Sequence, residues 1–65
     1  MRQKFLTLAQ QYAFDRGDVD WFCEVYSNYR DMGFDVHDST WMTLNYLYVA
    51  DTANMLQQQA APAFV

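Results

Sequence analysis

The sequence is poor in the residues that small domains use to reinforce a fold. It has a single cysteine, Cys23, and a single histidine, His37, among 65 residues. One cysteine excludes an intrachain disulfide, and one cysteine with one histidine cannot complete the ligand set of a structural zinc site. A chain of this length buries only about 60% of the surface that it exposes when unfolded, so its own core provides a small margin of stability. We therefore expect oligomerisation or a partner protein to supplement the fold.

The lone cysteine indicates a cellular setting. Cys23 falls on the apolar side of a helix predicted over 19–32, where we expect a reduced thiol in the core. A reduced thiol favours a cytoplasmic location. No segment approaches the ~20 apolar residues of a membrane span, so no membrane partner is expected. The N-terminal stretch M-R-Q-K-F-L-T-L-A-Q-Q is basic, but its apolar run is short and contains Gln, so we do not expect a signal peptide.

Motifs that support catalysis are also scarce. Gly17 and Gly33 are the only glycines, so a glycine-rich phosphate loop is not possible. The segment D-R-G-D-V-D at 15–20 lacks the Gly and Glu that a calcium loop needs at its sixth and twelfth positions. D-V-H-D at 35–38 places His37 between carboxylates, but no nucleophile completes a triad, so a surface or capping role is expected. We predict that the protein is not an enzyme and has no catalytic residues, cofactor or metal.

Cations are few and unevenly placed. The chain has 4 Lys or Arg residues against 8 Asp or Glu residues, a formal net charge of −4. Arg2, Lys4 and Arg16 lie near the N-terminus, and Arg30 is the only later Lys or Arg. Every acid except Asp15 follows residue 16. Because an acidic protein repels phosphate backbones, we expect no direct nucleic-acid binding, and a basic protein surface is the more favourable partner.

Apolar and aromatic residues, by contrast, are abundant and helically spaced. Hydrophobic residues make up 52% of the chain and aromatic residues 18%. Apolar residues recur on one face of a helix over 2–16 and on one face of a helix over 19–32. Gly17 and Gly33 each follow one of these helices, in the position of a glycine that ends a helix. Asp18 is the expected N-cap of the second helix.

The stretch Ser39 to Ala60, which lies in the longest run without Gly or Pro, predicts a third helix. It begins at 36 or 39, depending on whether Asp35 or Asp38 is its N-cap, and ends near 60. At ~1.5 Å per residue, this helix extends beyond the other two. The predicted fold is all-α: one domain over 1–60, a small three-helix bundle (2–16, 19–32 and 36/39–60) with an overhanging C-terminal helix, followed by a flexible tail over 61–65.

The overhang predicts self-association. Its apolar side chains, Met55 and Leu56 among them, require cover from outside the monomer. A further reason is the aromatic surplus, which a short chain cannot bury completely. We predict a homodimer or larger homo-oligomer, with an interface formed by Met42, Tyr46, Val49, Ala53, Met55 and Leu56. The protein is then a small acidic protein–protein interaction module.

An alternative function follows from the polar face of the second helix. Asp20, Glu24 and Asp31 recur there at helical spacing, either as a solvated stripe or as an acidic docking face for a basic partner. In size, acidity and aromatic content the chain resembles the general format of small phage-encoded inhibitors. That resemblance implies an inhibitor that blocks a basic groove of a nucleic-acid-handling protein. The C-terminal Ala63-Phe64-Val65 is a minor candidate for capture in a peptide groove.

Overall fold

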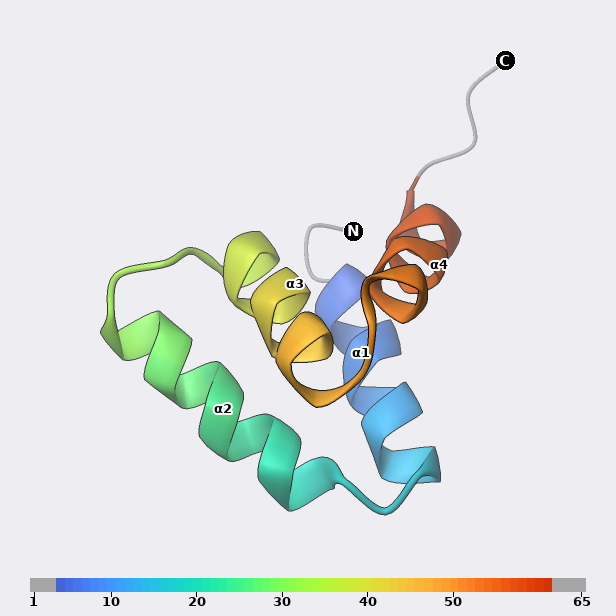
Figure 1. The fold of residues 1–65 in the computed structure, drawn as a ribbon. Helices are drawn as coiled ribbons and strands as arrows, with labels where there is room; N and C mark the ends of the chain where they lie inside the picture. The colour runs from blue at the N-terminus through green and yellow to red at the C-terminus, as the bar shows by residue number, and fades with distance from the viewer. Residues whose placement is uncertain (1–3, 62–65) are drawn as a thin grey trace.

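The computed structural model describes residues 4–61 as a succession of four helices (Figure 1). They are α1 (Lys4–Asp15), α2 (Val19–Asp31), α3 (Val36–Leu47) and α4 (Ala50–Ala60). α1 and α3 form the centre, with α2 packed on one side and α4 on the other, and α2 does not contact α4. The described part of the chain contains no strand, so the all-α class is confirmed. The predicted tail beyond Ala61 lies outside the described residues.

Both glycines end helices in the left-handed conformation, as predicted. Gly17 has φ +77 and Gly33 has φ +103, values that a Cβ disfavours. After Gly33, the amide of Phe34 donates to the Tyr29 carbonyl at 3.2 Å, and the two rings pack edge to face with centroids 6.1 Å apart. After Gly17, the amide of Asp18 donates to the carbonyl of Ala13, five residues earlier, at 2.8 Å. Both ends are therefore Schellman motifs, which satisfy the last carbonyls of α1 and α2.

The helix starts use their aspartates differently. Asp35 is the N-cap of α3, and its Oδ1 accepts a hydrogen bond from the Asp38 amide at 2.8 Å. This decides between the two cap candidates that the sequence leaves open. Asp18 occupies the N-cap position of α2, but its carboxylate makes no capping hydrogen bond. The Asp18 side chain instead accepts from a residue of the α3–α4 junction, described below.

The single long helix predicted from 36 or 39 to 60 is wrong, because the chain leaves the helical conformation after Leu47. Val49 is extended, with φ −130 and ψ 163, and α4 then packs against α1. No Gly or Pro marks the break. Asp51 lies in the first turn of α4, where the helix dipole favours a carboxylate. Within residues 4–61, four helices therefore replace the expected three, and two helices take the place of the expected long C-terminal helix.

The core draws residues from all four helices. It contains Phe5, Ala9, Ala13, Phe22, Leu44, Ala53 and Leu56. The α3–α4 break brings Ala53 and Leu56 into contact with the other core residues. Burying a Leu side chain contributes about 1.5–3 kcal/mol to the stability of the fold. α3 adds three buried hydroxyls, and each donates to a backbone carbonyl within 3.2 Å. These are the hydroxyls of Ser39, Thr40 and Thr43.

α2 buries a narrower arc than its apolar spacing predicts. Phe22 and Val25 are buried, whereas Trp21 and Met32 are exposed. Cys23 is exposed as well, so the expectation of a core thiol is wrong. The reason is that α2 packs mainly against α3, and one neighbouring helix covers only part of a wide apolar arc. The uncovered part of the arc forms the candidate site.

Candidate protein-binding groove

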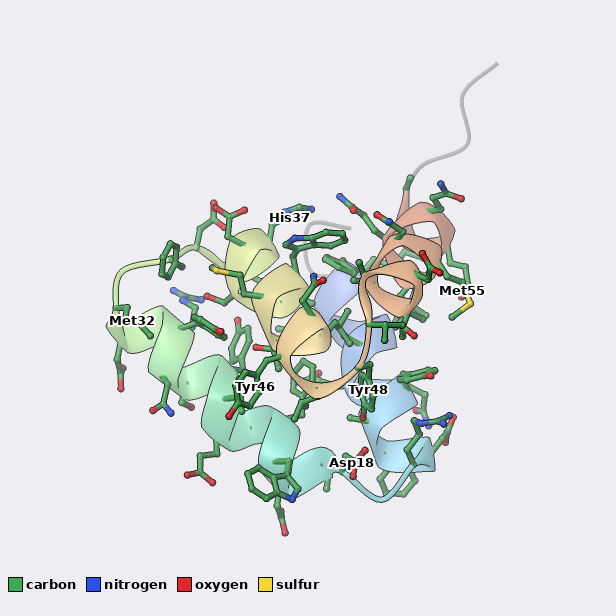
Figure 2. The ribbon with its side chains drawn as sticks, in the orientation of Figure 1. Asp18, Met32, His37, Tyr46, Tyr48 and Met55 are labelled. Atoms are coloured by element: carbon green, nitrogen blue, oxygen red, sulfur yellow. The ribbon has the colours of Figure 1, made fainter. Side chains whose placement is uncertain are left out.

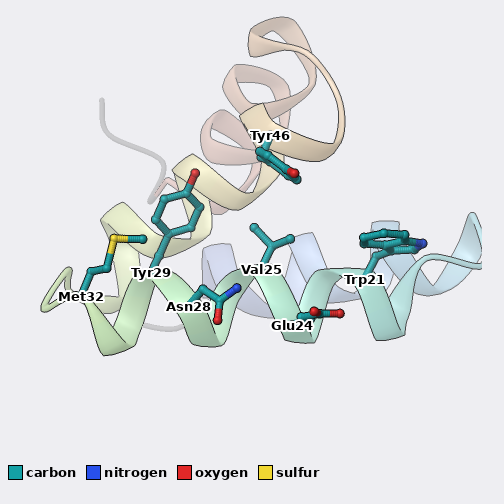
Figure 3. A pocket seen from close by; sticks show the side chains of 7 residues that line it. All are labelled: Trp21, Glu24, Val25, Asn28, Tyr29, Met32 and Tyr46. Atoms are coloured by element: carbon teal, nitrogen blue, oxygen red, sulfur yellow. The ribbon is translucent and has the colours of Figure 1, made fainter.

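A groove of about 240 Å³ lies between α2 and α3 (Figure 3). Most of its lining comes from successive turns of one side of α2 and from its C-cap, Met32. Tyr46 of α3 lies over this side of α2. The lining residues of this α2–α3 groove are Trp21, Glu24, Val25, Asn28, Tyr29, Met32 and Tyr46.

A second hollow, of about 390 Å³, is lined by Asp18, Trp21, Tyr46 and Leu47. Trp21 and Tyr46 line both spaces, so the two hollows adjoin at this pair of rings. Trp21 is 59% exposed and Tyr46 is 67% exposed. Large aromatic side chains with this much exposure are typical of surfaces that bind other molecules. We refer to these residues as the Trp21–Tyr46 pair.

Each hollow has one carboxylate among its described lining residues. Glu24 lines the α2–α3 groove and Asp18 lines the second hollow, whereas no Lys, Arg or His of residues 4–61 lines either. Within residues 4–61 the only contact at salt-bridge distance is between His37 Nδ1 and Asp38 Oδ1, at 3.5 Å. Neither Glu24 nor Asp18 therefore has a salt-bridge partner in the described chain. Each hollow therefore presents a carboxylate beside exposed aromatic rings.

A hydrogen bond from Tyr48 positions the Asp18 side chain, which lines the second hollow; both residues are labelled in Figure 2. The Tyr48 hydroxyl donates to Oδ2 of Asp18 at 2.8 Å, which links the α3–α4 junction to the start of α2. The Tyr48 ring packs edge-on against Tyr12, with centroids 5.0 Å apart, and the Arg16 guanidinium lies 5.0 Å from the Tyr12 centroid. Burial raises the pKa of the Tyr48 hydroxyl, and the hydrogen bond to the Asp18 carboxylate raises it further.

The predicted self-association residues are divided by the fold. Ala53 and Leu56 belong to the core of the monomer, and Met42 is half-buried. The other members, which are exposed, are Tyr46, Val49 and Met55. Tyr46 lies over α2, whereas Met55 points outward from α4 on another side of the molecule (Figure 2). The structure does not gather the six residues into one surface.

The predicted acidic docking face lies on the surface of α2. Asp20, Glu24 and Asp31 are all exposed, and their docking role stays a prediction. Of the three, only Glu24 lines a hollow. The α2–α3 groove therefore combines Glu24, from the predicted acidic face, with Tyr46, from the predicted self-association surface.

Sequence reasoning missed Trp21 as a surface residue because Trp21 belongs to the apolar arc of α2. The signal that could have found it is the width of that arc, which exceeds what one neighbouring helix covers. Asp18 was expected to cap α2, and no local signal indicates its pairing with Tyr48. That pairing depends on two segments that are distant in the sequence.

The described residues contain neither a candidate metal cluster nor a candidate membrane span. No group of His, Cys, Asp and Glu side chains among residues 4–61 is arranged to hold a metal ion. Of the helices in the described range, none has both the length and the apolar character needed to cross a membrane. The chain has no match among protein-family models, curated proteins or solved structures. Fold and surface thus define a small all-helical protein with an acidic aromatic groove.

Proposed function

We propose that the protein is a small acidic protein–protein interaction module that binds a basic partner through the α2–α3 groove. The observation that supports this proposal most strongly is the exposed Trp21–Tyr46 pair between two carboxylate-bearing hollows. Aromatic residues contribute much of the binding energy at protein interfaces, because they bury a large area with few rotatable bonds. The groove supplies both the apolar contact and the charge for recognition.

The charge of the chain determines the kind of partner. A net charge of −4, with Asp20 and Asp31 exposed on the same helix as Glu24, attracts a basic surface and increases its rate of association. A basic groove of a nucleic-acid-handling protein is one surface of this kind. With such a partner, the chain occupies the basic groove of the partner and excludes nucleic acid from it. The chain then acts as an inhibitor of the nucleic-acid-handling protein.

The test uses a synthetic amphipathic peptide with arginines on its polar face and a matched peptide in which glutamates replace them. Each is titrated into the isotope-labelled protein and followed by NMR. We expect the arginine peptide to shift the Trp21 indole and Tyr46 resonances, with affinity that falls as salt is added, and the glutamate peptide to bind far more weakly. The absence of binding, salt-independent binding, or shifts confined to α4 would contradict the proposal.

Self-association through the C-terminal helix is a second proposal, supported by the exposed Val49 and Met55. Because Ala53 and Leu56 already pack in the monomer, such an interface would use only the outer face of α4. We expect the double variant Val49→Asp/Met55→Asp to reduce the molar mass measured by light scattering while the circular dichroism spectrum is unchanged. A wild-type protein that remains monomeric at high micromolar concentration would exclude this proposal.

A further inference from the structure

The α2–α3 groove and the second hollow meet at the Trp21–Tyr46 pair, and each has its own carboxylate. We propose that they are two subsites for two cationic side chains of one partner segment. One arginine or lysine lies beside Glu24 and the other beside Asp18, and the stretch of chain between them crosses the aromatic pair. This inference rests on the proposed function and specifies the chemistry of the partner.

The α2–α3 groove is suited to a long cationic side chain. Val25 is buried and Tyr29 half-buried, so they form an apolar surface between α2 and α3, and Glu24 is exposed. Lysine and arginine carry an aliphatic stem below a charged head. The stem can pack against the apolar lining while the head reaches the Glu24 carboxylate. The amide of Asn28, on the same side of α2, adds a polar contact for the head group.

The second hollow has a carboxylate that is already positioned. The Tyr48 hydroxyl occupies Oδ2 of Asp18 at 2.8 Å and leaves Oδ1 as an acceptor. The nearby Arg16 lies over the Tyr12 ring, at 5.0 Å from its centroid, and makes no ion pair with Asp18. Half-buried Leu47 supplies the apolar contact in this hollow. A cationic head group from a partner therefore meets a fixed acceptor that has no salt-bridge partner in the described chain.

The shared rings favour cations over other occupants. The face of an aromatic ring attracts a guanidinium or ammonium group, most strongly for Trp. Trp21 and Tyr46 each line both hollows, so a cation in either one lies near the same rings. A second copy of this chain is a poor occupant, because a symmetric contact through this surface would bring the Glu24 and Asp18 carboxylates of the two copies together. A basic segment of a different protein fits the charge.

The test compares four peptides on one amphipathic scaffold. The first peptide has two arginines placed one helical turn apart. The second keeps only one of these arginines and the third keeps only the other, with glutamine in place of the missing one. The fourth has glutamine at both positions. A second set places the arginines two turns apart. Affinities are measured by calorimetry for the wild type and for the Glu24→Gln and Asp18→Asn variants. Asp51→Asn, which removes the same charge from α4, is the matched control.

We expect the two-arginine peptide to bind most tightly in one of the two sets. In that set, Glu24→Gln weakens binding of the peptide that keeps one arginine, and Asp18→Asn weakens binding of the peptide that keeps the other. Each loss should be roughly two- to fivefold, as for exposed charge pairs. Asp51→Asn should reduce the affinity of all charged peptides equally, and by less than Glu24→Gln or Asp18→Asn does. Tyr48→Phe, which releases the Asp18 carboxylate, should follow the Asp18→Asn pattern with a smaller loss.

Two outcomes overturn the inference, and they are distinguishable. In the first outcome, the peptides bind with salt dependence, but the three charge variants lower the affinity equally, whichever arginine the peptide keeps. General electrostatic attraction then accounts for binding. The two-subsite inference then fails and the proposed function stands. If the two-arginine peptides of both sets do not bind the wild type, both fail. Circular dichroism of each variant establishes that a loss of affinity does not result from unfolding.

Discussion

Tyr48 donates a hydrogen bond from its hydroxyl to Oδ2 of Asp18 at 2.8 Å, across 30 positions of the sequence. This contact joins the α3–α4 junction, which contains no Gly or Pro, to the N-cap residue of α2. It has a second consequence, because Asp18 also lines the hollow beside the Trp21–Tyr46 pair. One hydrogen bond thus contributes both to the fold and to the candidate site.

Replacing Tyr48 by Phe should destabilise the protein. The change removes the hydrogen bond to Asp18 but keeps the ring against Tyr12, so we expect a loss of about 0.5–1.5 kcal/mol in the free energy of unfolding. Urea denaturation measures it. Tyr46→Phe is the matched control, because the Tyr46 hydroxyl is exposed and makes no hydrogen bond among the described residues. Equal losses in the two variants would show that the Tyr48 contact does not stabilise the fold.

Stability should fall at alkaline pH through Tyr48. Burial and then the Asp18 carboxylate raise the pKa of its hydroxyl, so the folded state favours the neutral phenol. A group whose pKa is raised by folding stabilises fully below its unfolded pKa, about 10 for tyrosine, and this contribution is lost as the pH rises above that value. The free energy of unfolding of the wild type should therefore decrease more steeply above about pH 10 than that of Tyr48→Phe. Parallel pH profiles for the two proteins would contradict this assignment.

Two neighbouring residues of α4 distinguish the four-helix fold from an overhanging helix. Leu56 is 5% exposed in the core, so Leu56→Ala should cost about 2–5 kcal/mol of unfolding free energy. Met55 is 43% exposed, so Met55→Ala should change stability by less than about 0.5 kcal/mol. The measurement is chemical denaturation at a concentration where light scattering shows a monomer. A frayed α4 would instead make both substitutions nearly neutral.

The start of α3 gives a test of capping. Asp35 accepts the Asp38 amide, so Asp35→Ala should lower the free energy of unfolding by about 0.5–2 kcal/mol. Asp38 lies in the first turn and pairs only with exposed His37, so Asp38→Ala should cost about 0.3–1 kcal/mol through lost charge–dipole attraction. Thermal unfolding of both variants gives the comparison. A larger loss for Asp38→Ala would transfer the capping role to Asp38.

Local signals in the sequence determined much of the fold. Apolar spacing predicts α1 and α2, and Gly17 and Gly33 mark their ends because only glycine adopts the left-handed conformation readily. The all-α class follows from the same spacing, which is helical throughout. The exposure of Glu24 was also predictable, since it lies on the polar face of α2. These features depend on residues within a few turns of one another, so the sequence pattern contains them.

Only the tertiary structure decided where the third predicted helix breaks and what surface results. The segment from Ser39 to Ala60 has no strong helix breaker, and its break at Val49 depends on partners from other helices. The Tyr48 hydroxyl donates to Asp18 and Leu56 is buried in the core, and these contacts offset part of the loss of backbone hydrogen bonds at the break. The groove likewise unites Glu24 and Tyr46, which the sequence pattern assigns to separate surfaces. Helical periodicity gives the face of each residue on its own helix, and packing between helices determines which faces stay uncovered.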